Sequence, residues 1–172
     1  LEPWTRAHPG CQSLFKECFL GDLDERLRAA QLDMVIIPRQ PRASLAKSVE
    51  VLPFYAEDLY YLSRSALLPS AAALGEVTLA EIADDVFVLG PDGCGLAAFT
   101  RDLFKAARLR LREYRGQALS YQAMQDWADL GIGSTILPAS KIAAQFRPRA
   151  QRIVARVKRP ASIGFDAMWM QI

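Results

Sequence analysis

The segment ADLGIGSTILP, residues 128–138, contains a helix end, two glycines and the start of a strand. Gly131 is placed to end the helix as a C-terminal cap, and Gly133 allows the strand to begin at once. A helix that passes directly into a buried strand is typical of α/β folds. We interpret both glycines as architectural and expect neither to contact a ligand.

The composition is that of a globular protein with a substantial core. The chain has 172 residues, of which 51% are apolar and 23% charged, enough for one large domain or two small lobes. A net charge of +2 gives no bulk electrostatic reason to expect binding to nucleic acid or membranes. No apolar run approaches the roughly 20 residues of a membrane span. The first residues, LEPWTRAHPG, do not form a signal peptide, and we interpret the sequence as an excerpt of a longer chain.

The cysteines and the single histidine give little capacity for metal or nucleophilic chemistry. Cys11, Cys18 and Cys94 show no CxxC spacing, which predicts reduced thiols and a cytoplasmic location. His8 stands beside Pro9 and Gly10, where an exposed turn is expected. We therefore predict no catalytic residue, no metal site and no cofactor.

The first third of the chain predicts a βαβ unit. Residues 1–6 are expected to end a helix, and residues 11–17 alternate as a strand does. Asp22 and Glu25 fit a capping box for the next helix. The apolar run at residues 34–37 is typical of a strand buried on both faces. Together these elements predict a parallel sheet with a right-handed crossover.

The middle of the chain begins with extended segments. Residues 49–55 and 57–63 predict two strands joined by a short polar turn. Residues 67–75 suggest a loop or a weak helical turn. Thr78 and Glu81 then form a second capping box over an expected short helix.

A second α/β pattern follows. The expected elements are a buried strand at residues 85–90, a glycine-rich turn that opens a helix at residues 91–95, and a strand at residues 109–114. Ser120 caps the next helix, and a strand at residues 134–137 completes the pattern.

The last part of the chain predicts a helix and a final strand. The helix is expected at residues 139–146 and the aromatic strand at residues 163–172. Residues 139–160 contain no acidic side chain. This stretch could contact nucleic acid, but we interpret it as a solvated face, because the overall charge is nearly balanced and Phe146 is its one aromatic residue. Two α/β blocks separated by extended segments predict two lobes.

Several of these segments, in this order, resemble the LysR-type transcriptional regulators. In GDLDERLRAAQLDMVIIP, residues 21–38, a capped helix runs through Leu27, Leu32 and Asp33 into a buried strand, as in that family. Further segments resemble the crossing segment, the second-lobe helix and strand, and the Gly-x-Gly strand entry: VLPFYAEDLYYLS (51–63), LAEIADDVFVLGPDG (79–93) and ADLGIGSTILP (128–138).

The resemblance implies a type 2 periplasmic-binding-protein fold, in which two α/β lobes joined by two crossing strands bind a small effector in their cleft. Lobe I would comprise residues 1–62 plus 163–172, and lobe II residues 63–162. The sequence departs from the family pattern, since it lacks the helix-turn-helix, the N-terminal strand of lobe I and the closing helix. The resemblance also implies a homodimer or tetramer that contacts DNA only through the missing N-terminal domain.

Candidate ligand contacts follow from the position of strand ends and helix N-termini, where open α/β sheets bind ligands. We predict ten such residues: Cys18, Phe19, Leu20, Pro38, Arg39, Cys94, Gly95, Leu96, Ser120 and Tyr121. Arg39 could hold a carboxylate with two hydrogen bonds or be a solvated surface arginine. The turn at Cys94 could instead be an ordinary strand-to-helix connection. Ser120 could serve only as a helix cap.

The leading hypothesis is a sensor domain that binds a small carboxylate or aromatic acid and has no catalytic activity. The alternative is a solute-binding protein of the same fold that delivers its ligand to a transporter. An enzyme on this fold is a third class, which would need a placed acid–base group or a covalent cofactor.

Overall fold

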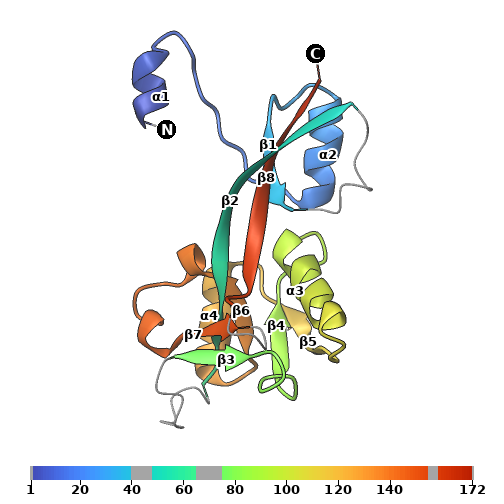
Figure 1. Ribbon diagram of the computed structural model, residues 1–172, viewed down its shortest axis with the longest axis vertical. Helices are drawn as coiled ribbons and strands as arrows, with labels where there is room; N and C mark the ends of the chain where they lie inside the picture. The colour runs from blue at the N-terminus through green and yellow to red at the C-terminus, as the bar shows by residue number, and fades with distance from the viewer. Residues whose placement is uncertain (1, 40–47, 65–74, 155–158, 172) are drawn as a thin grey trace.

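The computed structural model describes residues 2–39, 48–64, 75–154 and 159–171. Helices and strands alternate along most of this length (Figure 1). In chain order the elements are α1 (Glu2–Ala7), α2 (Leu20–Arg28), β1 (Val35–Pro38), β2 (Val49–Leu62), β3 (Glu76–Thr78), β4 (Val86–Leu89), α3 (Gly95–Ala106), β5 (Arg112–Gln117), α4 (Tyr121–Leu130), β6 (Thr135–Pro138), the 3-10 turns η3 (Ala139–Lys141) and η4 (Arg147–Arg149), β7 (Gln151–Val154) and β8 (Ser162–Met170).

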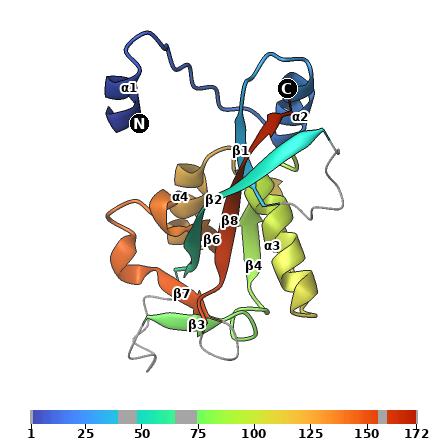
Figure 2. The same cartoon turned by 45° about the horizontal axis from the view of Figure 1, so that its top comes forward.

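Strands β2 and β8 form the longest pairing in the described structure. They run antiparallel from Val49 opposite Met170 to Asp58 opposite Ser162, with a register shift between Pro53 and Tyr55. A proline has no N–H to donate, which fits a break in the ladder at this point. The two strands lie side by side through the middle of the molecule and join its two ends (Figures 1 and 2).

Two hydrophobic clusters lie at opposite ends of this strand pair. The α2 cluster is small and consists of Leu27, Val35, Ile37 and Met168. The main cluster is larger and takes in the far ends of the crossing strands, including Leu59 and Ile163, together with α3, α4, β4 and β6. Both crossing strands thus contribute to both clusters, as a two-lobed fold requires. The division into lobe I, residues 1–62 plus 163–172, and lobe II, residues 63–162, remains a prediction from the sequence.

The second α/β pattern is confirmed. Strands β4, β6 and β8 and helix α3 form where the sequence predicts them. The Ser120 hydroxyl caps α4 by accepting a hydrogen bond from the Ala123 N–H at 3.1 Å. Gly131 ends α4 in the left-handed conformation, with φ of 78°.

Gly133 is required for a different reason from Gly131, namely the close approach of another strand. A Cβ atom at this position would lie 2.7 Å from the backbone oxygen of Val86 and 3.1 Å from the Val88 side chain. Strand β6 therefore begins against β4 at a distance that only glycine permits.

The predicted βαβ unit is wrong in its first strand. Residues 11–17 form neither helix nor strand, and all of them are exposed. The described structure places no strand beside them to supply hydrogen bonds, so the alternating pattern alone forms no strand. Helix α1 lies at the far end of this extended segment, apart from the other elements (Figures 1 and 2). The Asp22 capping box is also wrong: Phe19 is the N-cap of α2 and makes no side-chain capping bond.

Strand β1 differs from its prediction in burial and in direction. Its side chains alternate, with Val35 and Ile37 buried and Ile36 exposed, so one face and not both is covered. It pairs antiparallel with β8, Val35 opposite Met168. The predicted parallel pairing at this point is therefore wrong, because the neighbour of β1 comes from the other end of the chain.

The extended segments predicted as two strands form a single strand, β2. The short turn expected between residues 55 and 57 is wrong, because Tyr55, Ala56 and Glu57 all stay paired with β8. Polar side chains are tolerated here because this part of β2 lies between the two clusters, where Glu57 and Asp58 are half-buried.

Three shorter predictions also need correction. Thr78 donates from its N–H and hydroxyl to Glu81 at 2.7 and 2.8 Å, but residues 79–84 make successive turns and no α-helix. The predicted helix at 139–146 is reduced to η3 and a turn. Strand β5 begins at Arg112 and not at residue 109, because α3 ends through Arg108 at φ of 56°.

Two predictions fall wholly or partly outside the described residues. The loop at residues 67–74 lies outside them, as do residues 155–158 of the basic stretch. No helix among the described residues is long and apolar enough to cross a membrane.

The close approach at Gly133 gives a test of the fold. We expect Gly133→Ala to lower the free energy of unfolding by about 1–3 kcal/mol, because the new methyl group overlaps backbone in a packed region. Chemical denaturation followed by circular dichroism measures this change. Gly21→Ala in α2 is the matched control, since nothing lies within 4 Å of its added Cβ and alanine favours the helix. Equal stability of the two variants would contradict the packing argument.

Candidate functional site

The turn before α2 lies against the turn that opens α3. The Leu20 N–H donates to the Gly93 oxygen at 3.1 Å. A Cβ atom at Gly93 would lie 3.1 Å from Cδ1 of Phe19. Two of the predicted ligand residues, Phe19 and Leu20, are thus brought to the glycine-rich turn that the sequence singled out.

The end of β1 lies on the same turn. A Cβ atom at Gly95 would lie 2.7 Å from Cγ and 3.1 Å from Cδ of Pro38. Gly95 is the first residue of α3, and Cys94 is its N-cap without a side-chain hydrogen bond. Residues from the α2 side of the molecule therefore cover this helix N-terminus directly.

The glycine-rich turn is fixed from the other side by an ion-pair network. Arg101 of α3 donates to both carboxylate oxygens of Glu113 on β5, at 2.9 and 2.8 Å, and to Asp92 in the turn at 3.0 Å. The Arg101 hydrogen bond holds the pKa of Glu113 below its usual value, against the opposing effect of partial burial. Within the turn, the Cys94 N–H donates to Pro91 at 2.8 Å.

Arg39 is held on β8 by its backbone and its side chain. Its N–H donates to the Gly164 oxygen at 2.8 Å, and its Nε donates to Oδ1 of Asp166 at 2.9 Å. The Arg39 side chain is 51% exposed, whereas that of Asp166 is only 8% exposed. Glycine at position 164 leaves room for the Arg39 side chain, because a Cβ atom there would lie only 3.1 Å from the guanidinium carbon. A buried carboxylate thus orients an accessible guanidinium.

Tyr121, at the start of α4, lies in a partly buried and charged environment. Burial is the largest cause that raises the pKa of its phenol to about 12, followed by the nearby Cys94, Glu17, Tyr55 and Glu57. The Lys141 ammonium lies 5.6 Å from the centre of the Tyr121 ring. Tyr121 and Cys94, at the two predicted helix starts, both pack against the main cluster.

Sequence reasoning missed several residues at this place. Tyr55 of β2 stacks on Phe165 of β8 with ring centres 4.7 Å apart. Glu57 accepts hydrogen bonds from the Ser140 N–H at 2.7 Å and from its hydroxyl at 3.0 Å. Asp166 was also missed. The sequence does contain a signal for Asp166, which is the one charged residue in the otherwise apolar segment IGFDAMWM, residues 163–170. Nothing local in the sequence marks Tyr55 or Glu57.

The remaining predicted ligand residues, Cys18, Leu96 and Ser120, are hydrogen-bonded neither to the Arg39–Asp166 pair nor to the turn at Gly93 among the described residues. Cys18 is half-buried. Leu96 is 4% exposed, with its side chain in the main cluster. Ser120 caps α4 through its hydroxyl, and its predicted contact with a ligand stays a prediction. No group of three metal-ligating side chains is close enough to hold a metal ion in the described part of the chain.

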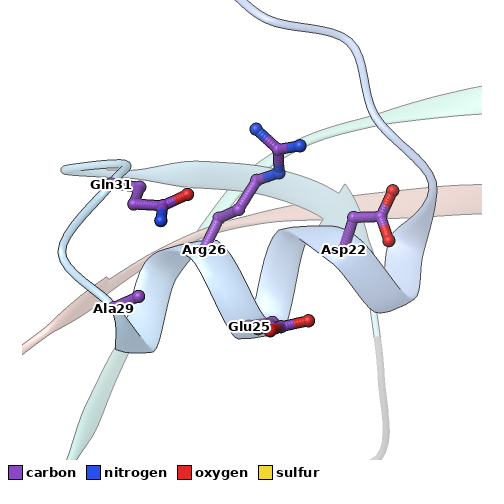
Figure 3. A pocket seen from close by; sticks show the side chains of 5 residues that line it. All are labelled: Asp22, Glu25, Arg26, Ala29 and Gln31. Carbon is purple, nitrogen blue, oxygen red and sulfur yellow. The ribbon is translucent and has the colours of Figure 1, made fainter.

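A shallow hollow on the outer side of α2 is a separate feature. It is lined by Asp22, Glu25, Arg26, Ala29 and Gln31 (Figure 3). Its volume of about 220 Å³ is below that of usual small-molecule sites. It shares no residue with the predicted set.

The described architecture is that of a two-part α/β ligand-binding fold with two crossing strands. The sequence matches the LysR substrate binding domain over residues 1–170. The chain therefore belongs to the LysR substrate-binding family and is an effector-binding domain of a transcriptional regulator.

Solved structures are similar in fold at low sequence identity. The Synechocystis PCC6803 CcmR regulatory domain in complex with 2-PG has a TM-score of 0.75 and 17% identity, covering 98% of this chain and 78% of that one. The C-terminal domain of a probable LysR family regulator from Rhodococcus sp. RHA1 has a TM-score of 0.75 and 22% identity, covering 99% and 81%. The effector-binding domain of QuiR in complex with shikimate has a TM-score of 0.74 and 15% identity, covering 98% and 78%. No curated protein sequence matches the chain.

The environment of Tyr121 gives a spectroscopic test of the site. We expect its phenol to ionise near pH 12, seen as a late rise in phenolate absorbance that Tyr121→Phe removes. Because the folded pKa lies above the ordinary value of 10, the associated stability is present below pH 10 and is lost as the pH rises towards 12. A titration of Tyr121 near pH 10 in the folded protein would contradict this environment.

Proposed function

We propose that this domain binds a small carboxylate or aromatic acid between lobe I, residues 1–62 plus 163–172, and lobe II, residues 63–162. The single observation that carries the proposal is the Arg39–Asp166 pair. A half-exposed guanidinium held by a buried carboxylate is pre-oriented for an anion, and no group in the described ranges is hydrogen-bonded to its two Nη atoms.

Aromatic side chains near the same place support an aromatic or ring-shaped ligand. The stacked Tyr55 and Phe165 lie on the two crossing strands, and Phe19 is 55% exposed at the turn before α2. The shikimate found in QuiR carries both a ring and a carboxylate. The ligand contacts we propose are the sequence-predicted residues, with Leu96 taking part only through its backbone at the start of α3, extended by Tyr55.

The proposed action is regulatory. LysR regulators bind small-molecule effectors and DNA and form oligomers, and the family match gives the same class to this chain. We propose that effector binding shifts the relative position of the lobes, and with them the subunits of a dimer or tetramer. DNA contact would come from a separate helix-turn-helix domain in a cytoplasmic regulator.

Two other classes have less support. The family match does not support the alternative function of a solute-binding protein that delivers its ligand to a transporter. An enzyme would need a nucleophile with an adjacent base or a placed acid–base pair. We propose that the domain has no catalytic activity.

A thermal-shift screen with aliphatic and aromatic carboxylates, each paired with its neutral amide, tests the proposal. We expect one or more acids to stabilise the domain, by about 2.7 kcal/mol at a hundredfold excess over Kd, while the amide does not. Each ligand that binds is also assayed for turnover, and its consumption would contradict the sensor assignment.

Substitution of Arg39 tests the anchoring residue. We expect Arg39→Gln to weaken binding of such an acid about ten- to hundredfold, because a charge-assisted hydrogen bond is lost. Arg28→Gln is the matched control: Arg28 also donates Nε to a carboxylate at 2.9 Å, but both partners are exposed. Equal affinity of the two variants would exclude Arg39 as the anchor.

A further inference from the structure

We infer that the contact of Phe19 and Pro38 with the turn at Gly93 and Gly95 is a closing contact between the lobes, which sets how far apart they stand. This inference rests on the proposed function, because it concerns the opening through which the effector would enter. It assigns to these residues a role that ligand contact alone does not explain.

The fit at the contact leaves no free space. The Pro38 ring fills the position that a side chain at residue 95 would take, with Cγ only 2.7 Å from that Cβ. The Phe19 side chain lies as close to residue 93, with its Cβ, Cγ and Cδ1 within 3.2 Å of the position that a Cβ would take. Contacts below 3.0 Å require a shift of one partner. Gly95 is thus needed for the two surfaces to meet, whereas a Cβ at residue 93 would push Phe19 aside by a few tenths of an ångström.

Pro38 is held in place from behind. It pairs with Phe165 in the β1–β8 ladder, and the next residue, Arg39, is bonded through its backbone to Gly164 and through Nε to Asp166. The proline ring is rigid. Pro38 therefore has little freedom to retreat from a larger residue at position 95.

The opposite surface is held as firmly. Arg101 ties Asp92 in the turn to Glu113 on β5, and the Cys94 N–H closes the turn on Pro91. Leu96 and Ala97 of α3 are buried in the main cluster. With both surfaces fixed to their own cores, an added methyl group has to be accommodated by separation of the lobes.

The position of Arg39 connects this contact to the effector. Pro38 makes the contact and Arg39, the adjacent residue, is the proposed carboxylate anchor. An anion bound by the Nη groups would pull on Arg39, whose backbone N–H and Nε hold the end of β1, and with it Pro38, against β8. Ligand binding and lobe separation would then be coupled through two consecutive residues.

Distance measurements between spin labels test the inference without any ligand. A keto-bearing aromatic residue is introduced at Arg28 on α2 and at Asp102 on α3, both exposed, and each is coupled to a nitroxide. We expect Gly95→Ala to lengthen the mean distance between labels, whereas Gly21→Ala, with nothing within 4 Å of its Cβ, leaves it unchanged.

A rescue variant separates lobe opening from local distortion. In Pro38→Ala with Gly95→Ala, the new methyl group occupies space that the proline ring has vacated. We expect the distance to return towards that of the wild type. An unchanged distance in Gly95→Ala, or no return in the double variant, would overturn the inference.

Phe19→Ala gives a further measurement if Gly95→Ala does not fold. It removes the contact without adding atoms, and we expect a broader distance distribution with an unfolding transition still present by circular dichroism. A distribution as narrow as that of the wild type would overturn the inference. A failure of the carboxylate screen leaves these distances unaffected, so the two proposals fail separately.

Discussion

The antiparallel pairing of β2 with β8 is the constraint on which the rest of the structure depends. These strands bring residues 49–62 beside residues 162–170, and each passes from the α2 cluster into the main cluster. Strand β1 pairs with β8 at one end of this pair, and β6 and β7 pair with β2 at the other. The Arg39–Asp166 bond and the stacked Tyr55 and Phe165 both form on it, so the candidate site is a product of the same pairing.

Local signals in the sequence predicted the elements whose stability is local. Ser120 caps α4 and Gly131 ends it because each acts on hydrogen bonds within a few residues. The buried strand β4 and the glycine-rich turn before α3 also form where expected. Periodicity alone predicted an α/β fold with two lobes. The resemblance of several segments in order to the LysR-type regulators specified the fold family, and the family match confirms that family.

The failures in strand formation and strand direction share a physical cause, which is dependence on a distant partner. Residues 11–17 have a strand pattern, but no described strand lies beside them. The direction of β1 is set by β8, more than a hundred residues later in the chain. Among the candidate residues, Phe19, Pro38 and Gly95 converge and Arg39 gains a partner, whereas Tyr55, Glu57 and Asp166 were missed because their importance arises only from the residues that the fold brings to them.

The α2 cluster is assembled from both ends of the chain, since Leu27 and Val35 pack with Met168. The intervening residues that form most of the main cluster are in effect an insertion between two partner strands. Exchange of one half between relatives during evolution would therefore need two simultaneous junctions, one in each crossing strand.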